Sequence, residues 1–468
     1  MTEDEKVKII ESIHKRYGDE HRYFKWVTDD EASAAEAERS EILDSVKNNI
    51  LFGCNGTKPY YIDISPGCKH CGGGTWSCLF INGKCNGRCF FCPSEQKMIG
   101  VPGTNSLQFP SPADYLDYLN IFGIRGVSIS GGEPLLTLDK STRFLSSVQH
   151  RFGNNIHKWL YTNGTLLSEE ALKILRDAGL NEIRLNLVAQ NYNVEKIRLA
   201  SLFIDTVTVE IPAIPEDYER LSSLLPHLAA NGVKFLNLHQ LRCTTYNYRK
   251  FMERGYTFLH GPDVTVLESE LTALKLIKSA VDSGLNLPIN YCSFVYRNSF
   301  QRIGARHRSA PCLLKPYEEI TDTGMIRTLS TKLIKEESDR IISAMRDNGE
   351  PESSVNYDLK TMKLSFPASI MKYLSGQSPV TLSYYDTTLS SSASYRNVFK
   401  EILLNTKKKI IAERWRAIPD IELNGDEMRI FKERYLDESH SEGSAPDLDK
   451  WAKINSMELI HEGLQNYW

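Results

Sequence analysis

Long apolar runs are missing from this chain of 468 residues, and so is any large excess of one charge. No apolar stretch is long enough to cross a bilayer, and the charged beginning MTEDEKVKIIESIHKRY lacks the apolar centre of a signal peptide. A net charge of −3 gives no support to binding of nucleic acid or membranes through overall charge. We therefore expect a cytoplasmic globular protein without a membrane partner, and nucleic acid is not favoured.

Cysteine is absent from residues 313–468, whereas seven of the ten cysteines fall between Cys54 and Cys92. Disulfides are rare in the cytoplasm, so cysteines gathered in this way indicate metal ligands. The hydrophobic content of 41% and the charged content of 25% are those of ordinary globular proteins. The length exceeds one typical domain, which predicts one large catalytic domain with additions.

The segment from Phe80 to Glu95, FINGKCNGRCFFCPSE, holds Cys85, Cys89 and Cys92 in the spacing CxxxCxxC. Three thiolates on one short loop suit a [4Fe-4S] cluster, because they cap three irons and leave the fourth open to a small molecule. A zinc site or unligated thiols are the alternatives that the loop alone leaves open.

A second group of cysteines precedes this loop in residues 51–78, where glycine is also frequent. Cys54, Cys68, Cys71 and Cys78 supply four soft ligands, and the CxxC spacing of the middle two lets them share a metal. Three kinds of auxiliary site remain open: a second iron–sulfur cluster, a mononuclear iron with four thiolates, and a structural zinc. Cys54 is alternatively a plain buried thiol. A zinc ribbon would need two CxxC knuckles, which the segment does not have.

From Leu79 onward, short apolar runs alternate with segments of helical periodicity. The predicted strands are 79–82, 126–130, 156–161, 182–188, 205–211 and 233–238. The predicted helices are 111–121, 137–150, 168–178, 193–201 and 216–231, preceded by two more at 2–16 and 29–48. Repeated strand and helix units imply an α/β fold with a parallel sheet, as a full or partial (β/α) barrel. Functional sites in such folds lie at the carboxyl ends of the strands.

Two motifs stand at the ends of the second and third predicted strands. The second ends in Gly131-Gly132-Glu133-Pro134, where the glycines let a ligand approach the backbone and the glutamate offers an acceptor for an ammonium group. The third ends in YTNGT, residues 161–165. The order of cysteine loop, helix, GGEP and TNG resembles the radical S-adenosylmethionine (SAM) superfamily.

This resemblance implies a chemistry and a set of ligands. In that family the open iron of a [4Fe-4S] cluster chelates SAM, and one electron cleaves it to methionine and a 5'-deoxyadenosyl radical that abstracts hydrogen. The cluster ligands would be Cys85, Cys89 and Cys92. The residues implied to bind SAM are Phe91, Gly131, Gly132, Glu133, Pro134, Thr162, Asn163, Arg184, Asn186 and Ile211. An electron donor such as ferredoxin or flavodoxin is implied as a partner, and no catalytic side chain is assigned.

A basic and aromatic strip, NYCSFVYRNSFQRIGARHR, occupies residues 290–308. Its cations suit a carboxylate, a phosphate or a peptide C-terminus, or else form a solvated helix face; they are Arg297, Arg302, Arg306, His307 and Arg308. The strip, with FLNLHQL at 235–241, resembles a subgroup labelled as related to pyruvate formate-lyase activating enzymes. Asn237 and His239 are placed to reach a substrate. Cys292 and Cys312 flank the strip and are interpreted as isolated thiols rather than metal ligands.

Four parts are predicted along the chain: a helical segment 1–50, a cysteine-rich segment 51–78, the core barrel 79–291, and an α+β extension 292–468 that covers the barrel or binds substrate. The extension is expected to contain a helix at 332–348 and loops at 348–354, 387–395 and 437–449. Because it has no cysteine after Cys312, the cluster-binding SPASM domain of peptide-modifying radical SAM enzymes is excluded.

The expected activity is hydrogen abstraction from a peptide, a protein or a small natural product. Modification of RNA is an alternative that only the basic strip supports. An inactive, metal-stabilised binding module is another, against which the intact GGEP and loop cysteines argue. The residues before the cysteines are too few for a cobalamin-binding domain, so B12-dependent methyl transfer is not expected.

Overall fold

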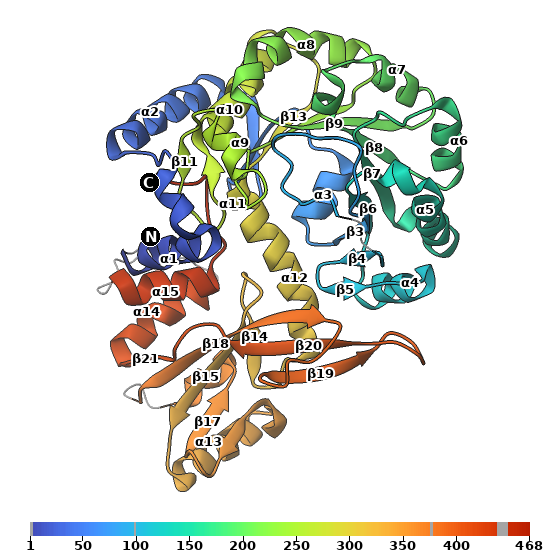
Figure 1. The fold of residues 1–468 in the computed structure, drawn as a ribbon. Helices are drawn as coiled ribbons and strands as arrows, with labels where there is room; N and C mark the ends of the chain where they lie inside the picture. Colours follow the sequence, from blue (N-terminus) through green and yellow to red (C-terminus); the bar gives the residue numbers. More distant parts are fainter. Residues whose placement is uncertain (1–2, 98–99, 375–377, 438–447) are drawn as a thin grey trace. The chain divides into compact units, whose positions relative to one another are not determined.

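The computed structural model describes residues 3–97, 100–374, 378–437 and 448–468. These described residues divide into two compact units. The larger unit consists of residues 3–302 and 461–468, and the smaller unit of residues 303–460. Figure 1 shows both, with the larger unit in blue, green and yellow and most of the smaller unit in orange and red.

A sheet of parallel strands forms the centre of the larger unit. In the described residues seven strands pair in parallel, in the same order as they follow in the chain. They are β3 (Trp76–Asn82), β6 (Gly126–Gly131), β7 (His157–Thr162), β8 (Glu182–Leu185), β9 (Thr206–Pro212), β10 (Phe235–His239) and β13 (Ile289–Cys292). Chain order is what right-handed crossovers between neighbouring strands produce. All of the predicted core strands are therefore present, and β13 extends the series.

Short antiparallel strands continue the sheet at both ends. The strand β2 (Lys58–Tyr61) pairs with β13, and β1 (Ile50–Gly53) pairs with β2. At the other end β3 pairs with β4 (Gly103–Thr104), which pairs with β5 (Leu107–Gln108). The sheet thus ends at β1 and β5, and the predicted partial (β/α) barrel is confirmed. The cysteine-rich residues 51–78 contribute strands to this sheet and are not separate from it.

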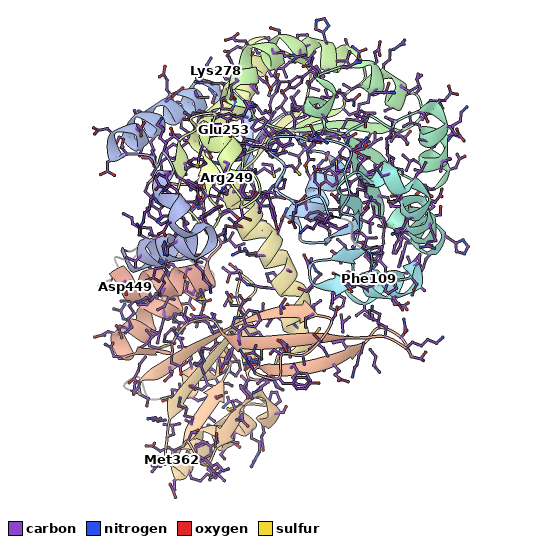
Figure 2. The ribbon with its side chains drawn as sticks, in the orientation of Figure 1. Phe109, Arg249, Glu253, Lys278, Met362 and Asp449 are labelled. Carbon is purple, nitrogen blue, oxygen red and sulfur yellow. The ribbon has the colours of Figure 1, made fainter. Side chains whose placement is uncertain are left out.

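Helices connect the parallel strands and run along the outside of the sheet (Figure 1). They are α4 (Pro112–Ile121), α5 (Leu138–Phe152), α6 (Glu169–Asp177), α7 (Glu195–Ser201), α8 (Tyr218–Ala230) and α10 (Leu267–Asp282). The first five agree in position with the predicted helices, whereas α10 was not predicted. The Ser168 hydroxyl caps α6 by accepting from the Ala171 amide. Phe109, labelled in Figure 2, is fully buried, with its ring centroid 5.2 Å from that of Tyr115 on α4.

The beginning of the chain is helical, as predicted. The helices are α1 (Glu3–Tyr17) and α2 (Asp29–Val46), and a capping box between Thr28 and Glu31 begins α2. A short helix, α3 (Pro66–Gly72), precedes the sheet, and the remaining elements of the larger unit are α9 (Tyr248–Met252), β11 (Phe258–Leu259), β12 (Thr265–Val266) and α11 (Phe294–Tyr296). No helix within the described ranges has both the length and the apolar content needed to cross a membrane.

The smaller unit is built on an antiparallel sheet, eight-stranded in the described residues. Its strands are β14 (Glu318–Ile320), β15 (Ile326–Lys332), β16 (Asn356–Asp358), β17 (Lys363–Phe366), β18 (Val380–Ser390), β19 (Val398–Leu403), β20 (Lys409–Arg416) and β21 (Ile421–Leu423). The helices are α12 (Arg302–Ser309), α13 (Lys335–Asp347), α14 (Gly425–Tyr435) and α15 (Leu448–Glu458). Its core includes Trp451, Phe431 and Leu382, whereas Met362, labelled in Figure 2, is 54% exposed between β16 and β17.

The predicted extension differs from the structure at one predicted loop. The predicted loop 387–395 is wrong in its first half, because Thr387–Ser390 belong to β18 and pair with β20. A stretch of polar residues was interpreted there as a loop, although the β-branched Thr387 and Thr388 suit a strand. The predicted loop 437–449 falls almost entirely on residues 438–447, which lie outside the described residues.

Candidate functional site

The loop that carries the three cysteines is joined to the GGEP segment through the backbone. The amide of Gly132 donates to the carbonyl of Asn82 at 2.7 Å, and that of Glu133 donates to the carbonyl of Lys84 at 2.9 Å. Gly131 has a φ of +134°, which side-chain-bearing residues rarely adopt. The glycines thus allow the end of β6 to lie directly against the start of the cysteine loop.

Replacing Gly132 by alanine should displace the loop, because the new Cβ would lie 2.2 Å from the carbonyl oxygen of Lys84. We expect a clear loss of loop-bound iron after anaerobic reconstitution. Gly100→Ala is the matched control, since no atom of the described residues lies within 4 Å of its Cβ position. Equal iron content in both variants would contradict the proposed coupling of the two segments.

Cys85, Cys89 and Cys92 converge on one side of a common cavity. The Gly87 amide donates to Cys85 Sγ at 3.3 Å, and Gln96 Nε2 donates to Cys92 Sγ at 3.5 Å. Burial, together with the charges of the two neighbouring thiols, raises the pKa of Cys89 to about 11. Three thiols gathered at one point, two of them with N–H donors at their sulfurs, fit an iron–sulfur centre with a cationic core.

The cavity has a volume of about 280 Å³, near the lower end of the range for ligand pockets. It lies at the carboxyl ends of the parallel strands, where the sequence predicted the site. Besides the three cysteines, its lining includes these residues implied to bind SAM: Phe91, Gly131, Gly132, Thr162, Asn163, Arg184 and Asn186. Glu133, Pro134 and Ile211 are not part of the lining.

Glu133 is fully buried, and its carboxylate is occupied by the protein's own donors. It accepts from the Thr162 hydroxyl and the Asn163 amide, both at 2.8 Å, and from the Leu135 amide at 3.0 Å. The expected contact with an ammonium group of the ligand stays a prediction, and it would have to use the acceptor site that remains on Oε2. The carboxylate fixes the TNG turn against the GGEP segment, and Gly131 and Gly132 present only backbone to the cavity.

Arg184 is 4% exposed, and each of its five N–H groups has an acceptor within the protein. Those acceptors are Glu182 Oε1, Glu210 Oε2, Tyr161 Oη, Ser65 Oγ and Cys68 Sγ. The predicted contact between Arg184 and the ribose or carboxylate of SAM would require one of these bonds to break. Although it lines the cavity, Arg184 is mainly an internal link between β8, β9 and the segment that carries Cys68.

The wall of the cavity formed by the last strands carries two arginines, Arg242 and Arg297; Arg242 is also paired with Asp263 at 3.5 Å, and Glu210 lines the same cavity. The guanidinium groups of Arg242 and Arg297 lie 5.3 and 5.1 Å from the ring centroid of Phe294. His239 also lines the cavity, and burial, reinforced by the charge of Arg297, lowers its pKa to about 4. His239 is therefore neutral near pH 7. Sequence reasoning did not single out Arg242, which follows the buried Leu241 and has no motif around it.

Asn237, a predicted substrate contact, points elsewhere. It is 2% exposed, and its amide donates to Cys68 Sγ at 3.4 Å and to Glu210 Oε2 at 3.1 Å. The predicted basic strip is also divided. Arg297 lines the cavity of the larger unit, whereas Arg306 forms an ion pair with Asp386 at 2.8 Å within the smaller unit.

A second set of thiols occurs on the β2–β13 side of the sheet. All ten cysteines lie in described residues and are free, and the charges of Cys54, Cys68, Cys71 and Cys292 all act on Lys58. Burial raises the pKa of Cys71 to about 11. The pKa of Cys292 is lowered. Burial alone would raise it, but the positive charges of Lys58 and Arg297 have the larger combined effect.

Cys78, predicted to belong to this set, is placed differently. It lies on β3, and its thiol interacts with the hydroxyls of Ser128 and Ser130 on the neighbouring β6. Closeness in sequence to Cys71 suggested a shared site, but the Cys78 side chain leaves the sheet on the same face as its partner Ser128. Cys292, interpreted as an isolated thiol, lies near Lys58 with Cys54, Cys68 and Cys71.

Comparison with known proteins identifies the family. Residues 79–198 match the family model described as the radical SAM superfamily. The chain is also 33% identical over 276 residues to MJ0021 of Methanocaldococcus jannaschii, which carries the provisional name of a glycyl-radical enzyme activating enzyme. This match covers 56% of the chain and 72% of the relative. The chain belongs to the radical SAM superfamily. It is therefore a radical SAM enzyme, and the family implies a [4Fe-4S] cluster and SAM.

Other relatives of this radical SAM enzyme match shorter regions. The GTP 3',8-cyclase of Aliarcobacter butzleri is 35% identical over 111 residues, which is 24% of the chain and 33% of the cyclase. The solved structure of Streptococcus suis SuiB bound to S-adenosylmethionine has a TM-score of 0.33 at 15% identity, covering 57% of this chain and 56% of SuiB. The chain thus spans about a third of the cyclase and about half of SuiB, and the likeness to SuiB extends no further than the fold.

Proposed function

We propose that this radical SAM enzyme holds its [4Fe-4S] cluster on Cys85, Cys89 and Cys92 and removes a hydrogen atom from a peptide or protein substrate. When bound, the cluster and SAM supply the one-electron cleavage that yields the 5'-deoxyadenosyl radical. The observation that carries the proposal is the convergence of the three thiols and the GGEP and TNG segments on one cavity.

Some residues around the cavity are placed to contact a ligand, and others hold the surrounding turns in position. Gly131 and Gly132 give a ligand close access to the backbone, and Phe91 and Asn186 add an aromatic and an amide surface. Glu133 and Asn163 keep the turns in place, with Asn163 Nδ2 donating to Asn86 Oδ1 of the cysteine loop at 2.7 Å. A low-potential donor such as ferredoxin or flavodoxin would supply the electron.

A peptide or protein substrate is favoured by the two arginines in the wall of the cavity. Arg242 and Arg297 offer two cations beside the Phe294 ring, which suit a carboxylate of a peptide. The name of MJ0021 assigns to that relative an action on another enzyme, so its substrate would be a protein. A small natural product with a carboxylate would satisfy the same cations.

The test uses lysate from cells grown in heavy water, separated into small-molecule, peptide and protein, and RNA fractions. Each fraction is incubated with the reduced enzyme and SAM, and deuterium is measured in the 5'-deoxyadenosine product. We expect label from the peptide and protein fraction only. Cys89→Ala protein gives the blank for each fraction.

Label from the RNA fraction alone would replace the substrate class with RNA, and label from the small-molecule fraction would replace it with a metabolite. Unlabelled 5'-deoxyadenosine from every fraction would contradict hydrogen abstraction from any substrate present in those cells. Absence of SAM cleavage by a protein with full cluster content would support an inactive binding module.

A further inference from the structure

Four thiols from three separate segments meet behind the cavity. Cys54 lies in the turn between β1 and β2, Cys68 and Cys71 lie on α3, and Cys292 ends β13. The antiparallel pairing of β13 with β2 places Cys292 near Lys58, and the Ser293 hydroxyl donates to the Thr57 carbonyl at 2.9 Å. The tertiary fold, rather than a local motif, thus assembles the set.

Close backbone contact brings α3 to the β1–β2 turn. A Cβ on Gly72 would lie 3.0 Å from Cys54 Sγ and 3.8 Å from the hydroxyl oxygen of Tyr296. Cys54 itself has a φ of +53°, which is uncommon for a residue with a side chain. A larger residue at position 72 would separate Cys54 from the α3 cysteines.

Polar groups donate hydrogen bonds to two of these sulfurs. Gln301 Nε2 donates to Cys71 Sγ at 3.5 Å, and Cys68 Sγ accepts from Asn237 and Arg184. The Tyr296 hydroxyl belongs to a residue only 1% exposed, and it interacts with the Cys71 thiol. Donors aimed at thiolate sulfur are a usual feature of iron–sulfur sites, where they tune the potential.

The cations beside the four thiols favour a negatively charged group at this site. Lys58 is 1% exposed, and its ammonium nitrogen lies 4.4 Å from the ring centroid of Tyr296. The four cysteines lie close enough to Lys58 to interact with its charge, so their ionisation on binding a metal would place negative charge beside it. Arg297, partly buried beside Cys292, adds a second cation. A buried cation is stable only with an opposite charge nearby, and a cluster held by four thiolates carries net negative charge.

We propose that Cys54, Cys68, Cys71 and Cys292 hold a second iron–sulfur cluster in which the protein caps every iron. Full ligation leaves no iron open to a substrate, so this cluster accepts or donates single electrons. One electron from a low-potential reductant converts the oxidised [4Fe-4S] core, of charge 2+, to the reduced core of charge 1+. Arg184 and Arg297 line the cavity and also interact with Cys68 and Cys292, so they stand between this centre and the substrate site.

The test compares Cys292→Ala with Cys78→Ala in the full chain, reconstituted anaerobically with iron and sulfide. Iron and sulfide per chain are measured, and the electron paramagnetic resonance of the dithionite-reduced protein is recorded with and without SAM. We expect about eight irons in the unchanged protein and in Cys78→Ala. Cys292→Ala should lose iron from one cluster only and keep the signal that SAM changes.

A triple variant, with Cys85, Cys89 and Cys92 replaced by alanine, separates this inference from the proposed function. It should keep about four irons and a reducible signal that SAM does not alter. Loss of iron in Cys78→Ala but not in Cys292→Ala would overturn the ligand set. Zinc in place of iron, or full iron content in both single variants, would overturn the cluster. Cys54→Ala provides a second ligand variant if Cys292→Ala does not fold.

Discussion

Replacing Cys89 by alanine is expected to abolish SAM cleavage. Cys89 lies between the other two thiols of the loop, and the charges of both act on it, so it shares their centre. Two remaining thiolates would hold the cluster weakly, and none of the other residues lining the cavity is a cysteine. The measurement is 5'-deoxyadenosine formed from SAM by the reduced protein, alongside iron content. The product should fall to the level of a protein-free blank.

Cys312→Ala is the matched control for this variant. Cys312 lies in the smaller unit, where its thiol donates to the Arg308 carbonyl at 3.7 Å, and nothing places it at the cavity. Its replacement should leave both cleavage and iron content unchanged. SAM cleavage by Cys89→Ala with a full complement of iron would refute the assignment of the loop as the cluster site.

Replacing Glu182 by alanine is expected to reduce the free energy of unfolding by about 3–5 kcal/mol, the range for breaking a buried ion pair. Glu182 is fully buried and accepts from Arg184 at 2.8 Å, Thr208 at 2.8 Å and the Gly67 amide at 3.1 Å. Without it, Arg184 loses one of its two carboxylates and α3 loses an attachment to the sheet. Urea unfolding followed by tryptophan fluorescence measures the change.

Glu169→Ala on α6 is the control, because that carboxylate is 60% exposed and pairs only with Lys173 in the same helix. An exposed pair contributes about 1 kcal/mol or less. Equal effects of the two replacements would show that the network around Arg184 does not stabilise the larger unit.

The same carboxylate gives the stability a dependence on pH. Burial acts to raise the pKa of Glu182, but Arg184 and His157 outweigh it and lower that pKa from 4.5 to about 2. Between these two values the unfolded chain binds the proton and the folded chain does not. The stabilisation is therefore complete above pH 4.5 and is lost as the pH falls towards 2. In Glu182→Ala this part of the acid dependence should disappear.

The sequence predicted those parts of the fold that depend on local pattern. Apolar periodicity located every core strand from β3 to β10, because each of them is buried by its own neighbours. The loop cysteines, GGEP and TNG were identified because each motif is continuous in the chain. The structure brings all three to one cavity, as their positions at strand ends implied.

What the sequence could not show was the partner of each polar side chain. The sequence did not indicate that Glu133 accepts a hydrogen bond from the Asn163 amide, which is 30 residues further along the chain. The exchange of Cys78 for Cys292 has a similar cause. Cys78 is close in sequence to Cys71. Cys292 is brought near the other thiols by the pairing of β13 with β2, which no local sequence pattern predicts.

The pairing of β2 with β13 also has a consequence for the order in which the parts of the chain fold during synthesis. The contact between Ser293 and Thr57 spans 236 residues. The strand β2 can therefore pair with β13 only after all seven parallel strands have been synthesised. Closing so long a loop is slow and comes late in folding. Cys54, Cys68 and Cys71 therefore leave the ribosome well before Cys292, and a nascent chain would present them as an incomplete set of thiols. The loop of Cys85, Cys89 and Cys92, complete within eight residues, needs no such delay.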